Sequence, residues 1–177
     1  MGPSEPAAAR PGRFVYTHSM FERYTEKARR IIFFAHYEAA HLGSREVEAT
    51  HLLLGTLRGA GDLMLELAAG EPERLAQLKA AAGNCQTQPQ KKIVTSVDLP
   101  LSHQSEHILA YAAEEAERLM HKHISPEHLV LGILRETGPA NDILVAHGIT
   151  LEATRQVARE RDARQWLSPP PRPRSPA

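Results

Sequence analysis

An internal repeat constrains the fold of this chain more than any other feature of its sequence. The segment ATHLLLGTLR, residues 49–58, returns 77 residues later as PEHLVLGILR, residues 126–135. At this offset eleven residues between positions 31 and 58 meet identical residues: Ile31, Ala35, Glu38, Ala39, Leu42, His51, Leu52, Leu54, Gly55, Leu57 and Arg58. A duplication explains this agreement better than chance, so we expect two copies of one structural unit.

Each copy has the hydrophobic periodicity of helices. Apolar residues recur at three-to-four spacing over residues 28–42 and again over 108–119, behind the capping residues Thr25 and Ser102, and Gly43 ends the first run. The repeated segment is apolar around most of a helix circumference, which predicts a buried helix. Two further helices are expected in each copy, near residues 63–68 and 73–82 and near 141–146 and 151–164. The sequence therefore predicts an all-α fold of two tandem, pseudo-symmetric repeats of about four helices each.

Changes in composition divide the chain into five parts. These are a disordered N-terminal tail (1–19), a first repeat (20–82), a linker (83–100), a second repeat (101–164) and a disordered Pro-rich tail (165–177). The linker segment KIVTSVDLP alternates in polarity, which predicts an extended stretch along the surface where the repeats meet. The Pro-rich tail could dock in an SH3-like groove, but we assign it no role. Met20 is an alternative to Met1 as the start of translation.

The composition favours a soluble globular protein. The 21 basic residues balance 21 acidic ones, so no excess positive charge is available to hold a nucleic acid or an anionic membrane. No signal peptide is recognisable, and no apolar run approaches the ~18 residues of a membrane span. The single cysteine, Cys85, cannot form an internal disulfide and is compatible with a reducing compartment. We expect a cytoplasmic monomer.

The segments FERYTEKARR, HLGSREVEATHLLLGTLR and HKHISPEHLVLGILRE closely resemble the two repeats of the Clp N-terminal (Clp R) domain family. The resemblance covers roughly residues 20–162. It implies the substrate- and adaptor-receiving domain at the front of ClpC- and ClpA-type unfoldases. Family members are usually joined to ATPase modules, yet this sequence has no G-x-x-x-x-G-K-[ST] loop and no length left for such a module. We therefore expect a free-standing, non-catalytic protein-binding domain whose partners are Clp ATPase or protease subunits or client proteins.

The resemblance also implies a ligand site. In ClpC-type relatives each repeated segment begins G-T-E-H, and its glutamate binds the guanidinium of phosphoarginine on marked substrates. The second repeat keeps this residue as Glu127, whereas the first has Thr50, so we expect the first site to be weak or lost. A carboxylate suits the task because it accepts two parallel hydrogen bonds from a guanidinium. In the alternative interpretation, which we favour, Glu127 merely stabilises the helix dipole, next to the capping residue Ser125 and the first-turn Pro126.

Other polar residues allow a functional and a structural interpretation. Thr25 and Ser102 stand where the family presents groups that help to hold the phosphate, but both also suit helix caps. A basic cluster on the first helix and an acidic run on its counterpart could attract partners, although solvated helix faces are the commoner explanation. These clusters are Lys27, Arg29 and Arg30, and Glu114, Glu115 and Glu117.

The ten histidines raise the question of a metal or catalytic site. His121 and His123 flank Lys122 without a recognisable ligand set, and His51 and His128 recur with the repeat, which favours packed, hydrogen-bonded side chains. We therefore expect no metal, no cofactor and no catalytic residue. Two alternatives stay open: a helical hydrolase that gathers histidines and carboxylates in a deep pocket, and a helical nucleic-acid-binding regulator, which the neutral charge disfavours.

Overall fold

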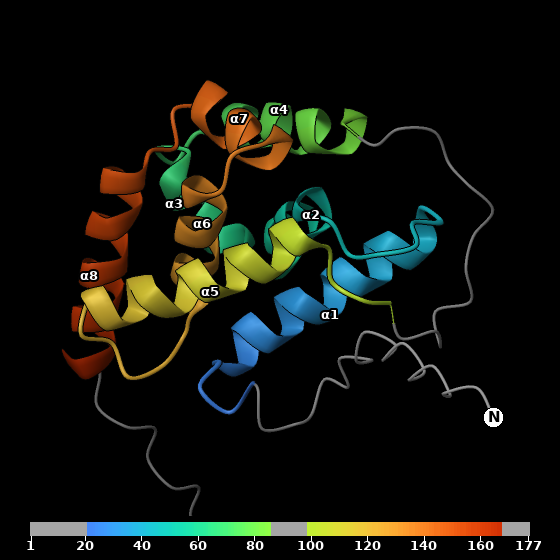
Figure 1. Ribbon diagram of the computed structural model, residues 1–177. Coiled ribbons are helices and arrows are strands. Elements are labelled where there is room, and N and C mark those ends of the chain that lie inside the picture. Colours follow the sequence, from blue (N-terminus) through green and yellow to red (C-terminus); the bar gives the residue numbers. More distant parts are fainter. Residues whose placement is uncertain (1–20, 86–98, 168–177) are drawn as a thin grey trace, which may run out of the picture.

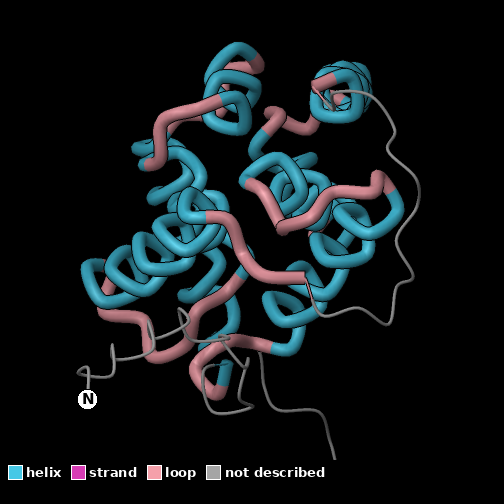
Figure 2. Tube along the Cα trace, turned by 45° about the vertical axis from the view of Figure 1, so that its right-hand side comes forward, coloured by secondary structure: helices cyan, strands magenta, loops and turns pink. Residues whose placement is uncertain are grey.

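A computed structural model describes residues 21–85 and 99–167, which form eight helices (Figure 1). The first repeat contains α1 (Glu26–His41), α2 (Ala49–Gly59), α3 (Gly61–Leu67) and α4 (Pro72–Asn84). The second contains α5 (His103–Arg118), α6 (Pro126–Arg135), α7 (Pro139–Ala146) and α8 (Leu151–Leu167). The described residues form helices and loops without a strand (Figure 2), so the predicted all-α fold with four helices in each repeat is confirmed. None of these helices is long and apolar enough to cross a membrane.

The predicted starts of the long helices are confirmed by their caps. The Thr25 hydroxyl accepts a hydrogen bond from the Ala28 N–H (3.2 Å), and the Ser102 hydroxyl accepts one from the Ser105 N–H (3.2 Å). Gly43 follows α1 with φ 73°, a left-handed conformation that glycine adopts without steric cost. The second repeat places Met120 at the equivalent position, with φ 61°, and the residue is 90% exposed.

Two predicted boundaries need correction. The predicted tail 165–177 is wrong for residues 165–167, because α8 continues to Leu167. Most of the last turn of α8 consists of good helix formers, namely Ala, Arg, Gln and Leu. The proline-rich segment that follows led to the prediction that the tail begins earlier. Helix α4 likewise runs to Asn84, two residues into the predicted linker. The predicted N-terminal tail, Met20, residues 86–98 of the linker and residues 168–177 lie outside the described residues; of the extended segment predicted over 92–100, the structure describes only Leu99 and Pro100.

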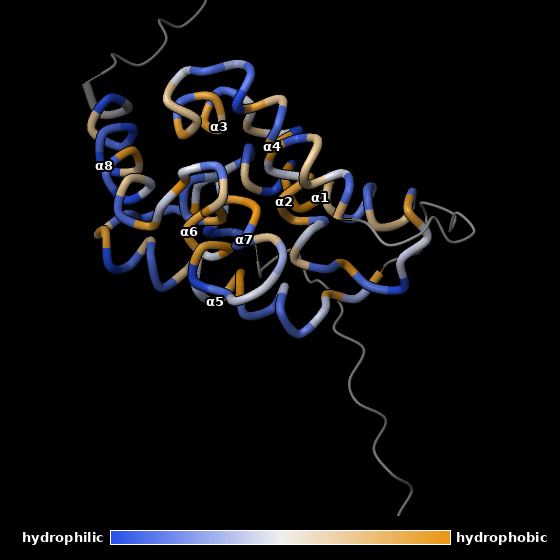
Figure 3. The backbone as a smooth tube through the Cα atoms, turned by 90° about the horizontal axis from the view of Figure 1, so that it is seen from above, coloured by the Kyte–Doolittle hydropathy of each residue, from blue (hydrophilic) through white to orange (hydrophobic). Residues whose placement is uncertain are grey.

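The repeated helices α2 and α6 form the centre of the molecule. Helices α1 and α5 cover them on one side and α4 and α7 on the other (Figure 1). In α6 every residue from Pro126 to Leu134 is buried. Apolar colouring accordingly concentrates on the inner helices, while α8 is mostly hydrophilic (Figure 3).

Each central helix crosses the long helix of its own repeat at a glycine. A methyl group placed on Gly55 would lie 2.5 Å from the carbonyl oxygen of Ile31, and one on Gly132 would overlap the carbonyl oxygen of Ile108. The two backbones therefore approach more closely than any side chain permits, which explains why both copies carry glycine here.

An arginine, a glutamate and an aromatic ring surround each crossing. Arg58 donates to Glu38 (2.8 Å), and its guanidinium lies 4.8 Å from the ring centre of Phe34. The second repeat builds the same arrangement from the residues 77 positions later, Arg135, Glu115 and Tyr111. This agreement of tertiary contacts confirms that the repeats are two copies of one unit.

The two repeats pair with each other reciprocally. The Thr25 N–H donates to the carbonyl of Ile124 (2.9 Å), and the Ser102 N–H donates to the carbonyl of Val47 (3.0 Å). Thr25 matches Ser102 and Val47 matches Ile124 at the offset of the repeat, so the contact has the self-complementary form of a two-fold interface. Each long helix consequently begins against the other repeat.

We predict that Gly132→Ala destabilises the protein by about 3 kcal/mol, because the added methyl group must displace the backbone at Ile108. Denaturant unfolding followed by circular dichroism measures this. Gly83→Ala is the matched control, since a methyl group there meets open space within α4; it should leave stability unchanged or raise it by up to about 1 kcal/mol. Equal stabilities of Gly132→Ala and the wild type would contradict the close crossing.

Candidate functional site

A pocket of about 800 Å³ opens where the N-termini of α1 and α6 meet α8. Its lining combines Thr25 and Lys27 from the first repeat with Glu127, Arg161 and other residues of the second. The reciprocal pairing of the repeats thus brings two of the four predicted site residues, Thr25 and Glu127, to one pocket. Thr50 and Ser102 are not among its lining residues.

Thr50 and Ser102 lie at the positions related to Glu127 and Thr25 by the repeat, and both are buried. The Ser102 hydroxyl, besides capping α5, donates to Ser105, whose hydroxyl donates to the carbonyl of Val47 (2.6 Å). The Ser102 and Ser105 hydroxyls are therefore bound within the fold, and Thr50 stands at the position that Glu127 takes in the second repeat.

Glu127 has an ion-pair partner that neither interpretation of the sequence included. Its side chain is only 7% exposed, and its carboxylate accepts a hydrogen bond from Arg161 of α8 (3.3 Å). Ser125 is the N-cap of α6 and Pro126 its first residue, as predicted. Glu127 therefore occupies a first helical turn but also binds a guanidinium.

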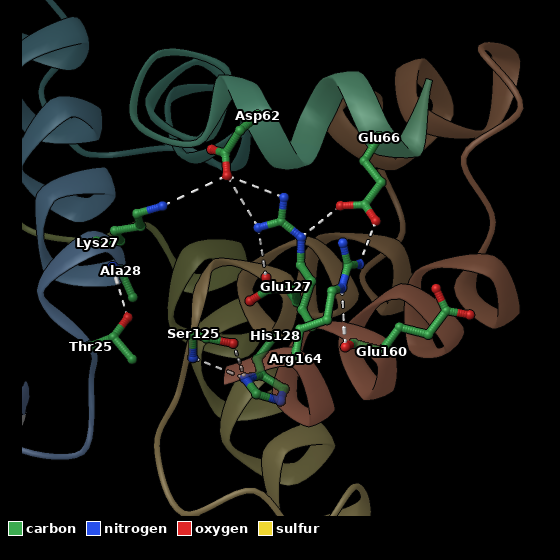
Figure 4. Close-up of polar contacts among 11 residues, drawn as sticks. Thr25, Lys27, Ala28, Asp62, Glu66, Ser125, Glu127, His128, Glu160 and Arg164 are labelled. Atoms are coloured by element: carbon green, nitrogen blue, oxygen red, sulfur yellow. Dashed lines mark hydrogen bonds and ion pairs between the residues drawn. The ribbon is translucent and has the colours of Figure 1, made fainter. Parts of the chain in front are cut away.

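Arg161 joins three carboxylates, which we call the carboxylate cluster: Asp62, Glu66 and Glu127. Its Nε donates to Glu66 (2.8 Å), and its Nη2 donates to Asp62 (3.1 Å). Figure 4 shows Asp62 and Glu66 projecting from α3 toward Glu127. Arg164 adds a second hydrogen bond to Glu66 (2.7 Å), so the cluster ties α8 to the first repeat as well as to α6.

Electrostatics keep Asp62 and Glu66 of the carboxylate cluster ionised. Burial alone would raise the pKa of Asp62 and of Glu66. For Asp62 the hydrogen bond from Arg161 and the charge of Lys27 outweigh burial, and for Glu66 the hydrogen bonds from Arg164 and Arg161 do, so both pKa values lie below their ordinary range. Burial likewise opposes the charge of Arg161, yet the hydrogen bond to Glu66 and the charge of Glu127 raise its pKa.

A second buried carboxylate attaches α8 to α5. Glu115 is fully buried and accepts a two-pronged pair of hydrogen bonds from Arg155 (both 2.9 Å) and one from Arg135 (3.2 Å). The hydrogen bonds from Arg155 lower the pKa of Glu115 despite its burial. The expectation that the acidic run over 114–117 is solvated is therefore wrong for Glu115, because α8 covers it with an arginine.

We predict that Glu115→Gln costs about 3 kcal/mol of unfolding free energy, since it leaves the charge of Arg155 without its buried partner. Glu38→Gln is the matched control from the first repeat, where the side chain is 20% exposed and pairs with Arg58; its cost should be about 1 kcal/mol or less. Urea denaturation of both variants gives the comparison. A larger loss for Glu38→Gln would contradict this assignment.

The repeated histidines are packed and hydrogen-bonded, as predicted. The Glu48 N–H donates to Nδ1 of His51 and the Ser125 N–H to Nδ1 of His128 (each 2.9 Å). Because Nδ1 of His128 accepts, the neutral ring carries its proton on Nε2, which donates to Nδ1 of His121 (2.9 Å). Within residues 21–85 and 99–167, no group of histidine, cysteine or acidic side chains has the arrangement of a metal site.

We predict that the protein loses about 2 kcal/mol of stability between pH 7 and pH 5 through His128. Burial, assisted by His121, lowers the pKa of His128 to about 4 from an ordinary value of 6.5. The unfolded chain therefore binds more protons than the folded chain between these values, and acidification favours unfolding. Urea midpoints across this range test the slope, which should be shallower in His128→Gln. A wild-type midpoint that does not change over this range would contradict the buried neutral ring.

Comparison with known proteins identifies the class of this two-repeat helical domain. The family model of the Clp repeat (R) N-terminal domain matches residues 23–147 and 100–165. The chain therefore belongs to the Clp N-terminal domain family.

Relatives and solved structures agree with this membership. The chloroplastic chaperone protein ClpC2 of Oryza sativa subsp. japonica is 36% identical over 133 residues, which cover 72% of this chain but 14% of the relative. The negative regulator of genetic competence ClpC/MecB of Bacillus subtilis is 28% identical, with 77% of this chain and 17% of the relative covered. The chain thus spans less than a fifth of the length of these relatives.

Among solved structures, the N-terminal domain of the ClpD chaperone from Arabidopsis thaliana aligns with a TM-score of 0.62 and 26% identity, over 81% of this chain and 96% of that domain. The Hsp104 N-terminal domain from Candida albicans aligns with a TM-score of 0.64 and 16% identity, over 80% of this chain and 92% of that domain, which shows the shared fold.

Proposed function

We propose that this chain is a non-catalytic protein-binding domain that receives adaptors, clients or ATPase subunits of Clp unfoldases. The observation that carries the proposal is the pocket that both repeats build around Glu127, in a chain of the Clp N-terminal domain family. A pocket made jointly by two structural units, with both charged and apolar lining residues, suits the side chains of a polypeptide.

The charges of the pocket support a ligand that carries both signs. Lys27 and Lys122 are exposed lining residues, and Glu127 and Asp162 supply the negative charge. A phosphoarginine side chain has this combination, so we propose it as a ligand, with its guanidinium toward Glu127 and its phosphate on the side of Thr25. Thr50 and Ser102 would form the weaker counterpart.

The geometry of the histidines argues against the hydrolase alternative. The Ser125 hydroxyl lies 2.9 Å from Nδ1 of His128, an arrangement that could in principle activate a nucleophile. However, the same nitrogen accepts the Ser125 N–H, and a pKa near 4 makes this ring a poor base at neutral pH.

A monomer in the cytoplasm is the setting that we propose for the binding role.

We predict that the wild-type chain binds the Clp ATPase ring of its own cell, or phosphoarginine-bearing clients, and that Glu127→Ala weakens this binding at least tenfold. Surface plasmon resonance with the purified ATPase and isothermal titration with a phosphoarginine peptide measure it. Glu73→Ala, at an exposed glutamate in the first turn of α4, is the matched control and should bind like the wild type. If the wild type binds neither the ATPase nor the peptide, the proposal is wrong.

A further inference from the structure

We infer that Arg161 is a built-in occupant of this pocket, which holds the guanidinium position closed until an arginine from a partner displaces it. The inference deepens the proposed function and rests on it only in assuming that partners bind at this pocket. It concerns the regulation of the site by the chain itself.

The contacts of Glu127 carry the first step. Its side chain is only 7% exposed, and among the described residues its carboxylate forms an ion pair with Arg161. A buried carboxylate is costly unless a cation accompanies it, so this position requires a positive group from some source. The chain supplies that group from α8.

The charge balance of the carboxylate cluster carries the second step. Three carboxylates face three cations. Lys27 lies 3.7 Å from Asp62, Arg161 pairs with Glu127, and Arg164 pairs with Glu66. Without Arg161 the cluster has a net charge of −1 and lacks the guanidinium that binds all three carboxylates. Planar guanidinium matches several carboxylate oxygens at once, whereas an ammonium group acts as a single point charge.

The repeat supplies a third, independent observation. The position 77 residues before Glu127 is Thr50, and the position 77 residues before Arg161 is Asn84. The first copy thus has neither the carboxylate nor the arginine, while the second copy has both. The carboxylate of Glu127 and the guanidinium of Arg161 thus occur in the same copy, as expected if Arg161 occupies the guanidinium position beside Glu127.

Tethering determines how such a site responds to a partner. A group on the same chain acts at an effective concentration on the order of millimolar, so a free arginine side chain competes poorly with Arg161. A partner that supplies additional contacts can displace it. Since Arg161 also binds Asp62 and Glu66, displacement would leave Arg164 as the arginine that pairs α8 with α3.

The test uses a fluorescein-labelled hexapeptide with one central arginine, and the same peptide with citrulline, which keeps the shape but lacks the charge. We predict by fluorescence polarisation that Arg161→Ala in the 177-residue chain binds the arginine peptide at least tenfold more tightly than the wild type does. The citrulline peptide should show no gain, and Arg161→Ala/Glu127→Gln should lose it. Arg159→Ala, an exposed arginine on the same helix, is the control and should match the wild type.

A folded Arg161→Ala variant with wild-type affinity for the arginine peptide overturns the inference, as does an equal gain for citrulline. If Arg161→Ala does not fold, Arg161→Gln is compared in the same way, and an unchanged affinity overturns the inference. No Clp subunit takes part in this measurement. Failure to bind the ATPase therefore counts against the proposed function, and failure to gain affinity counts against Arg161 as an occupant.

Discussion

The reciprocal backbone pairing between the repeats is the interaction on which the candidate site depends. Ile124 accepts the N–H of Thr25 and Val47 accepts that of Ser102, so each long helix starts against the repeat to which it does not belong. These reciprocal hydrogen bonds fix the relative position of the two repeats, and the four residues that form them are two equivalent pairs of the duplication. The pocket follows directly, because its α1 wall and its α6 wall come from different copies. Neither repeat alone contains the site.

The two copies share a scaffold and differ in their chemistry. Both retain the glycine at the helix crossing and the arginine–glutamate pair beside it, since these contacts set the distance between the packed helices. Around the pocket they diverge. Glu127 is the counterpart of Thr50, and Met120 adopts the left-handed conformation that its counterpart, Gly43, takes without steric cost. A duplicated fold can carry such differences because the glycine crossings lie outside the pocket lining.

Sequence reasoning predicted the helices, their caps and the buried repeated segment, because periodicity and capping are local properties. It could not predict the partner of Glu127, since Arg161 lies 34 positions after Glu127 in the sequence. Glu66, which shares this arginine, lies 61 positions before Glu127. The same limit applied to Glu115, whose run of acidic neighbours resembles a solvated face. One signal was available: the segment 151–164 carries four arginines and few large apolar residues, so a helix there can pack against the core mainly through ion pairs.

The most direct test of a site shared between repeats is an NMR measurement of proton–proton contacts across the interface. Nuclear Overhauser effects from the amide protons of Thr25 and Ser102 should connect the first to residues 124–125 and the second to residues 47–48. Both sets of contacts are predicted together, because the pairing is reciprocal. Contacts of either amide confined to its own repeat would contradict the shared interface and, with it, the pocket that unites Thr25 and Glu127.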